Sequence, residues 1–193
     1  MEDKPIKKHN HGPSFSTKLQ DSISKSITLF AKHIPLFLGL TTIAVLVINL
    51  VFLTKYPPVF VDEPVVAEDA WNWLKTGDDH GMMHQSLLDA ETGSGLRWPN
   101  MGFIPARIWG LFFTWLGLGL LSARLVSYVF GVLLIVANAT TGKVRYTAVT
   151  GWLGALLLSL SWLYMRTSHL VRPDIVLAAV VVGGFALQQV AFK

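Results

Sequence analysis

The sequence predicts an all-α integral membrane protein, a helical bundle with about four transmembrane helices and an outer loop that carries short juxtamembrane helices. Three observations predict this class. Of the 193 residues, 52% are hydrophobic and only 15% are charged, and the mean hydropathy of +0.48 is above that of ordinary soluble domains. Long uncharged runs recur along the chain. The charged residues gather in separate blocks between these runs.

Each long apolar run predicts one span, because a helix needs roughly 20 residues to cross a hydrocarbon core. Residues 1–33 come first and form a basic, cytoplasmic tail with six lysines and three acidic residues. This tail is too long for the n-region of a signal peptide, so the run that follows should stay in the protein as an anchor. The membrane domain covers residues 34–193, with spans expected near 34–53, 125–142, 146–165 and 175–192.

The placement of charge predicts the orientation. Positively charged segments favour the cytoplasmic side, which puts the N-terminal tail inside and the loop of residues 56–102 outside. This loop holds eight acidic residues and two basic ones, whereas residues 103–193 hold seven basic residues and one acid, Asp174. We expect the short connection with Lys143 and Arg145 to be cytoplasmic, and Asp174 to lie at the outer face beside the acidic loop.

A shorter apolar run, residues 108–123, decides the topology. Its 16 residues lie between Arg107 and Arg124 and make about 24 Å of helix. The run could cross the membrane with both arginines reaching toward water, or lie as a re-entrant or interfacial helix. We favour the second arrangement, because it keeps Lys143 and Arg145 on the cytoplasmic side.

Composition disfavours two other classes of protein. The formal net charge of +4 would suit nucleic-acid binding, but that function needs the basic residues on one surface. Here apolar runs separate them, so we expect membrane lipids and no nucleic acid as partners. The sequence contains no cysteine, which excludes a disulfide framework and any zinc–cysteine site.

The start of the outer loop predicts a short helix. Pro57 and Pro58 oppose helix formation, so the chain should leave the membrane in an extended form. Asp62 then suits the N-cap, and the segment to about Lys75 should be helical. Gly77 suits the C-terminal cap of this helix.

Four side chains of this predicted helix each allow two interpretations. Asp62 and Glu63 form an acidic pair where a span meets water, and helix capping with solvation explains the pair as well as a catalytic role does. Trp71 and Trp73 suit membrane-interface anchors. The alternative for both tryptophans is a platform that binds a sugar.

Asp174 also allows two interpretations. It follows Pro173 at the start of the last apolar run, where an acid complements the positive end of a helix. Ionisable groups at membrane depth are costly, however, and usually mark functional sites with a charged partner. We favour the functional interpretation, with Arg172 and Arg166 as the expected partners and His169 between them.

The order of these features resembles the first part of the GT-C glycosyltransferases. The more specific likeness is to the branch related to protein O-mannosyltransferases and lipid A aminoarabinose transferases, glycosyltransferase family 39-type. It rests on the anchor helix and on the loop that opens on Asp62-Glu63 and runs to Thr76-Gly77-Asp78. The likeness covers residues 34–193 and continues through three further segments: Pro105 to Gly117, Ala123-Arg124-Leu125-Val126-Ser127, and Ser168 to Asp174.

The resemblance implies transfer of a sugar from a polyprenyl-phosphate donor to a lipid, glycan or protein acceptor at the outer face of the membrane. It implies that Asp62 activates the acceptor hydroxyl, as a general base or through a divalent metal, with help from Glu63. Asp174 would be a second acid in the same cavity and the other candidate metal ligand. Arg172 or Lys75 would bind the donor phosphate, and Trp71 and Trp73 would contact substrate.

The chain departs from this family in its length, because family members carry many more spans. We therefore expect an N-terminal fragment of a longer enzyme, inactive on its own. The competing hypothesis is a small, non-enzymatic, multi-span membrane protein, such as a transporter subunit or an assembly factor, whose acidic loop binds a partner. Ion conduction through Asp174 is the weakest hypothesis, since no other acid lies within a span to continue a relay.

Overall fold

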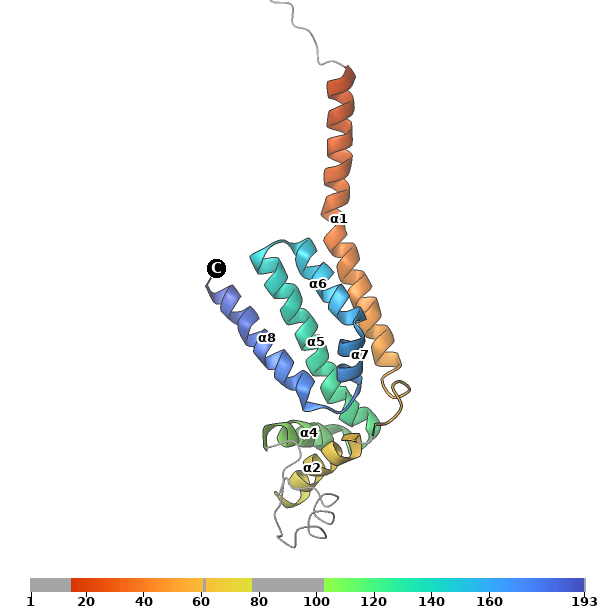
Figure 1. The fold of residues 1–193 in the computed structure, drawn as a ribbon, viewed down its shortest axis with the longest axis vertical. Helices are drawn as coiled ribbons and strands as arrows, with labels where there is room; N and C mark the ends of the chain where they lie inside the picture. Colours follow the sequence, from red (N-terminus) through yellow and green to blue (C-terminus); the bar gives the residue numbers. More distant parts are fainter. Residues whose placement is uncertain (1–14, 61, 78–102, 193) are drawn as a thin grey trace, which may run out of the picture.

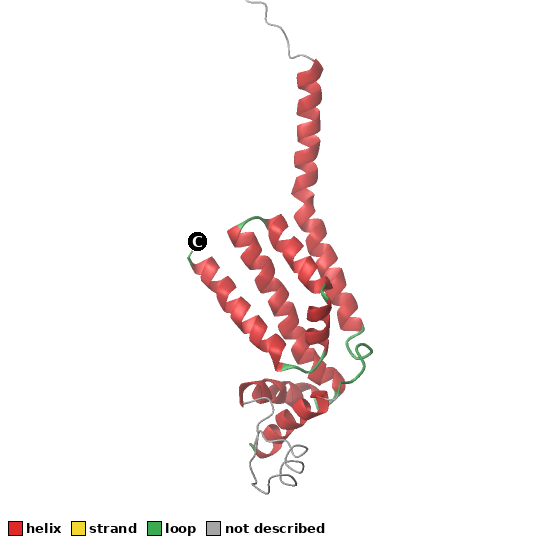
Figure 2. Cartoon of the chain, in the orientation of Figure 1, coloured by secondary structure: helices red, strands yellow, loops and turns green. Residues whose placement is uncertain are grey.

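The structure is a computed structural model that describes residues 15–60, 62–77 and 103–192. Within these ranges every regular element is an α-helix and no strand occurs, which confirms the all-α prediction. Most of the predicted acidic loop lies outside the described residues. The elements are α1 (Phe15–Val51), α2 (Asp62–Thr76), α4 (Phe103–Leu116), α5 (Leu120–Arg145), α6 (Ala148–Leu160), α7 (Trp162–His169) and α8 (Pro173–Ala191) (Figure 2).

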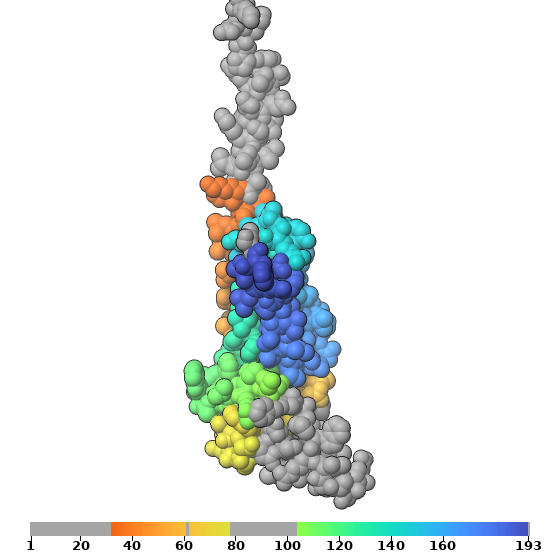
Figure 3. Space-filling view, turned by 90° about the vertical axis from the view of Figure 1, so that its left-hand side faces the viewer, coloured from red at the N-terminus to blue at the C-terminus, as the bar shows by residue number. Residues whose placement is uncertain are grey.

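The long helices run side by side, and two short helices lie across one end of them (Figure 1). Helix α5 is central and packs against α4, α6, α7 and α8, while α1 packs against α6. Helices α2 and α4 pack against each other and occupy the same end of the molecule in both views (Figures 1 and 3). We call this the α2–α4 end. The connection between α5 and α6 and the end of α8 lie at the opposite end.

Three helical segments are long and apolar enough to cross a membrane: Lys32–Val51, Leu120–Arg145 and Pro173–Ala191. They overlap the spans predicted at 34–53, 125–142 and 175–192. Their outward side chains are large and apolar, for example Phe37, which is 70% exposed, and Leu187, which is 72% exposed. Extended apolar surface of this kind is rare on soluble monomers. The described helices therefore suggest a membrane protein.

The span predicted at 146–165 forms two helices in the structure. Helices α6 and α7 meet at Ser161 with a bend of 67°, so the pair is either one broken span or a re-entrant loop. The backbone of Ser161 is extended, and its hydroxyl accepts a hydrogen bond from the Tyr164 N–H at 3.2 Å. Serine is favoured at such N-caps because it pairs one of the free N–H groups of a helix start. The bend needs neither proline nor glycine, which is why the apolar pattern did not predict it.

The apolar run at 108–123 is divided between α4 and α5. Helix α4 ends at Leu116, where Gly117 has a φ of +77° and its N–H bonds to the Phe113 carbonyl at 3.0 Å. Glycine suits this left-handed position after a helix. Helix α4 has 14 residues and is not among the described helices that are long enough to cross a membrane. It lies across the α2–α4 end. The Trp109 indole N–H ties it to α5 through the Ala123 carbonyl at 2.9 Å.

The predicted helix from Asp62 is α2. Asp62 lies in its first turn rather than at the predicted N-cap position, whereas the predicted C-terminal cap is confirmed. Gly77 has a φ of +77°, and its N–H bonds to the Trp73 carbonyl at 2.8 Å. The ring of Trp73 rests on Gly110 of α4, where a Cβ atom would come within 2.5 Å of it. The absence of a side chain at Gly110 thus lets α2 lie close against α4.

Candidate functional site

The centre of the α2–α4 end is a buried ion pair between α2 and α5. The Arg124 guanidinium donates from Nε to Glu63 Oε1 at 2.9 Å and from Nη2 to Glu63 Oε2 at 2.8 Å. Arg124 is fully buried and Glu63 is 3% exposed. This two-bonded geometry is the strongest form of arginine–carboxylate pairing. The pair joins residues that lie 61 positions apart in the chain.

Every acceptor position of the Glu63 carboxylate is occupied. Besides the arginine, Oε1 accepts the Val171 N–H at 3.1 Å, and Oε2 accepts the Phe60 N–H at 2.9 Å. A carboxylate offers about four lone-pair sites, and here each oxygen accepts two hydrogen bonds. Glu63 in this state cannot take a proton from a substrate hydroxyl without losing one of these bonds. Its contacts hold α2, α5 and the segment before α8 together.

Arg124 also fixes the chain that leaves α1. Its Nη1 donates to the carbonyls of Leu53 and Pro57, each at 2.9 Å. A second contact holds the same segment, since His169 Nδ1 bonds to the Tyr56 carbonyl at 3.0 Å. The turn after α1 is therefore anchored on both α5 and α7.

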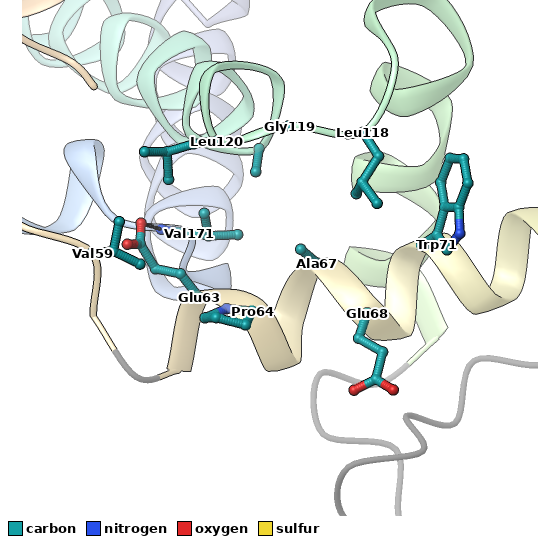
Figure 4. Close-up of a pocket in the computed structure, with 11 residues that line it drawn as sticks. Val59, Glu63, Pro64, Ala67, Glu68, Trp71, Leu118, Gly119, Leu120 and Val171 are labelled. Carbon is teal, nitrogen blue, oxygen red and sulfur yellow. Dashed lines mark hydrogen bonds between the residues drawn. The ribbon is translucent and has the colours of Figure 1, made fainter. Parts of the chain in front are cut away.

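A hollow of about 450 Å³ lies beside this ion pair, between α2 and the start of α5 (Figure 4). Its walls are mostly apolar. Figure 4 shows Trp71 and Leu118 at one side of the hollow and Val59 and Val171 at the other, with the Glu68 side chain directed away from it. The complete lining is Val59, Glu63, Pro64, Ala67, Glu68, Trp71, Leu118, Gly119, Leu120, Ala123 and Val171.

Asp62 and Asp174 lie at the same end of the bundle but in different surroundings. Asp62 is exposed in the first turn of α2 and does not line the hollow. Asp174 begins α8 and lines a separate hollow of about 360 Å³ that includes Ser161, Tyr164 and Thr167. Asp62 lines neither of these two hollows, so the cavity expected to contain both acids stays a prediction.

Of the expected partners of Asp174, the structure pairs it with Arg172. The Arg172 Nε lies 3.0 Å from Asp174 Oδ2, and both side chains are partly open to solvent. The backbone N–H of Arg172 donates to the Ser127 hydroxyl at 3.4 Å. The guanidinium expected to bind a phosphate thus already has one anionic neighbour. Arg166 lies elsewhere, over the ring of Phe60.

The remaining predicted substrate residues belong to α2 and differ in their surroundings. Trp71 is half-buried and lines the hollow. The ammonium of Lys75 lies 4.7 Å from the centre of the Trp71 ring, within range of a cation–π interaction. Trp73 is held between Gly110 and the Arg107 guanidinium, whose Cζ lies 5.5 Å from the ring centre. Trp71 is therefore available to a ligand, whereas Trp73 packs α2 on α4.

Asp62 and Asp174 were the candidate ligands for a divalent metal. Among the described residues, no group of three or more histidine, aspartate or glutamate side chains could hold a metal ion. Metal ions such as Mg²⁺ do not need three protein ligands when substrate phosphates and water complete the coordination. A metal role for Asp62 and Asp174 therefore stays a prediction.

The sequence did not identify Arg124 as the partner of Glu63. One signal pointed to Arg124, because a charge within an apolar helical run needs a buried partner. The sequence alone could not select which acid provides it. Comparisons with known protein families, with curated proteins and with solved structures found no match to this chain.

Proposed function

We propose that this chain forms a membrane-embedded part of a glycosyltransferase that moves a sugar from a polyprenyl-phosphate donor to an acceptor hydroxyl. The bond from the Val171 N–H to Glu63 Oε1, at 3.1 Å, carries this proposal. It joins the acidic start of α2 to the segment with Arg172 and Asp174, 108 residues later in the chain. The two segments that the resemblance assigns to catalysis thus meet at one end of the bundle.

Asp62 is the residue proposed to activate the acceptor. Its carboxylate is exposed in the first turn of α2, next to a Glu63 that is held by four hydrogen bonds. A carboxylate in this position can take the proton of an acceptor hydroxyl as the oxygen attacks the anomeric carbon. The bond from that carbon to the phosphate oxygen breaks, and the phosphate leaves with the bonding electrons. Glu63 is assigned to holding Asp62 in place rather than to the proton transfer.

The apolar hollow between α2 and α5 is proposed to receive the lipid part of a substrate. Its lining of Ala67, Leu118, Leu120 and Val171 suits hydrocarbon. Trp71 at its edge offers an aromatic surface that a sugar ring can stack on. With the α2–α4 end at the outer face, this hollow would open where a lipid-linked sugar meets water.

The test is sugar transfer from a labelled polyprenyl-phosphate sugar in membranes that contain the whole glycosyltransferase of which this chain is proposed to be a part. Asp62→Asn should lower the rate by about 10²–10⁴-fold, the usual contribution of a general base. The variant should keep the thermal unfolding midpoint of the unaltered protein, because Asp62 is exposed. A transfer rate unchanged by Asp62→Asn would disprove the role assigned to Asp62. Absence of transfer by the unaltered protein would favour the alternative, a non-enzymatic multi-span protein that binds a partner.

A further inference from the structure

A smaller hollow lies between the turn after α1 and helix α7. Its volume is about 190 Å³, and it is separate from the hollow beside Glu63. The turn contributes residues 56–60, and α7 contributes Trp162, Met165 and Arg166. The walls thus combine aromatic rings, prolines and a single cation. Val59 also lines the hollow beside Glu63, and the function proposed above uses none of the other side chains.

Arg166 is the charged group of this hollow. Its guanidinium Cζ lies 5.8 Å from the centre of the Phe60 ring, and the side chain is exposed. No carboxylate of the described residues forms an ion pair with it, whereas Arg124 and Arg172 each have one. A guanidinium stacked on a ring keeps its N–H edge free, and this edge matches a phosphate group with two parallel hydrogen bonds.

The aromatic rings indicate the depth of this hollow in a membrane. Tyr56 and Trp162 remain 43% and 59% exposed, and their ring centres lie 6.4 Å apart. Tyrosine and tryptophan are enriched where a membrane protein meets the lipid headgroups. Lys55, next to Tyr56, adds a second exposed cation. Positive charge and aromatic rings therefore gather around this hollow, a combination typical of the headgroup level of a membrane protein.

We propose that Arg166, with the aromatic walls formed by Tyr56, Phe60 and Trp162, binds the phosphate group of an anionic membrane lipid. The arginine contacts the phosphate, and the rings pack against the glycerol or the first carbons of the chain. This inference rests on the membrane placement proposed above and not on the sugar transfer. A transfer rate unchanged by Asp62→Asn, which would disprove the catalytic assignment, would leave it unaffected.

The experiment measures lipid binding to the full chain in a neutral detergent, by native mass spectrometry and by the shift in thermal unfolding midpoint. Phosphatidylglycerol should bind and raise the midpoint, and zwitterionic phosphatidylcholine should bind at least about 10-fold more weakly, since it carries no net charge. Arg166→Gln should weaken phosphatidylglycerol binding by about 10-fold or more, the usual loss of a charged hydrogen bond. Arg166→Lys keeps the positive charge but cannot form two parallel hydrogen bonds with the phosphate. It should therefore weaken phosphatidylglycerol binding less than Arg166→Gln does.

The chain offers a matched control in Arg145. Its guanidinium also stacks on a phenylalanine, with Cζ 5.1 Å from the Phe185 ring centre, but it already donates to Gln189 Oε1 at 2.9 Å. Arg145→Gln should leave phosphatidylglycerol binding unchanged. Equal losses in the Arg166 and Arg145 variants would overturn the site and indicate general charge attraction instead.

Two further arms identify the source of the phosphate. Polyprenyl phosphate that binds more tightly than phosphatidylglycerol, and depends on Arg166, would support the site and assign it to the lipid carrier. Tighter binding of phosphatidylglycerol than of polyprenyl phosphate would also support the site and would assign it to lipids of the bulk membrane. Inorganic phosphate that protects the protein as well as either lipid would overturn the lipid assignment. Lipid binding that is unchanged in Arg166→Gln would overturn the whole proposal.

Discussion

Arg124 is a fully buried cation in a helix that otherwise buries mainly apolar and small polar side chains. Removing a guanidinium from water costs several kcal/mol, and the cost is recovered only when its donors and its charge are all paired. Here Glu63 supplies the charge, and the Leu53 and Pro57 carbonyls supply further acceptors. Glu63 and Asp62 are adjacent acids with opposite surroundings. The Glu63 carboxylate is therefore structural, whereas the carboxylate of the preceding residue, Asp62, is exposed.

This difference predicts opposite effects of two conservative substitutions. Glu63→Gln leaves Arg124 buried without its counter-charge and should lower the free energy of unfolding by about 3–5 kcal/mol. Asp62→Asn removes an exposed charge and should change it by less than about 0.5 kcal/mol. Both values are measurable by denaturation of the purified protein in detergent. Equal stability of the two variants would contradict the role assigned to the ion pair.

Helices α5 and α6 approach so closely that their contact depends on two glycines. A Cβ atom at Gly142 would come within 2.6 Å of the Gly151 Cα, and one at Gly151 would lie 2.8 Å from the Lys143 backbone nitrogen. In a membrane, small residues let helix backbones approach and gain van der Waals contact without a hydrophobic driving force. The two glycines thus fix the turn of the chain between the two helices.

Gly151→Ala should therefore lower the free energy of unfolding by about 1–3 kcal/mol, the usual cost of overpacking. Gly154 is the matched control on the same helix, because its Cβ would lie 3.5 Å from Asn138 Oδ1, an ordinary contact. Gly154→Ala should be neutral or stabilising by up to about 1 kcal/mol, since alanine favours helix. The thermal unfolding midpoints of the two variants give the comparison. A Gly151 variant as stable as the Gly154 variant would show that the helices can separate at no cost.

An element could be predicted from the sequence when neighbouring residues determine it, and not when packing between distant segments does. The helix at Asp62–Thr76 follows from the acids of its first turn and from its glycine cap, and the long helices follow from uncharged runs, so both were predicted from the sequence. The bend at Ser161 has a local cause too, but serine is common in apolar helices and does not by itself indicate a break. The pairing of Glu63 with Arg124 depends on the packing of helices 61 residues apart, which no local pattern contains.

On the scale of the whole molecule, the path of the chain through the bundle agrees with the orientation predicted from the basic residues. The chain passes from α1 to the α2–α4 end, returns along α5, and comes back through α6 and α7 before α8 (Figure 1). The connection after Arg145 therefore lies at the end opposite α2, as expected if the apolar run at 108–123 does not cross the membrane. Lys143 and Arg145 mark one end of the bundle, while Asp62 and Asp174 mark the other.

The orientation is testable because the chain contains no cysteine, so that each introduced thiol is the only one. Thr76→Cys places an exposed thiol at the end of α2, and Thr147→Cys places one in the connection between α5 and α6. In intact cells, a membrane-impermeant maleimide should label position 76 and not position 147, because the basic connection favours the cytoplasm. Both positions should react after the membrane is dissolved in detergent, which verifies that each thiol is accessible. Labelling of position 147 in intact cells would reverse the orientation and place the Asp62 carboxylate on the cytoplasmic side, away from an outward-facing lipid-linked sugar.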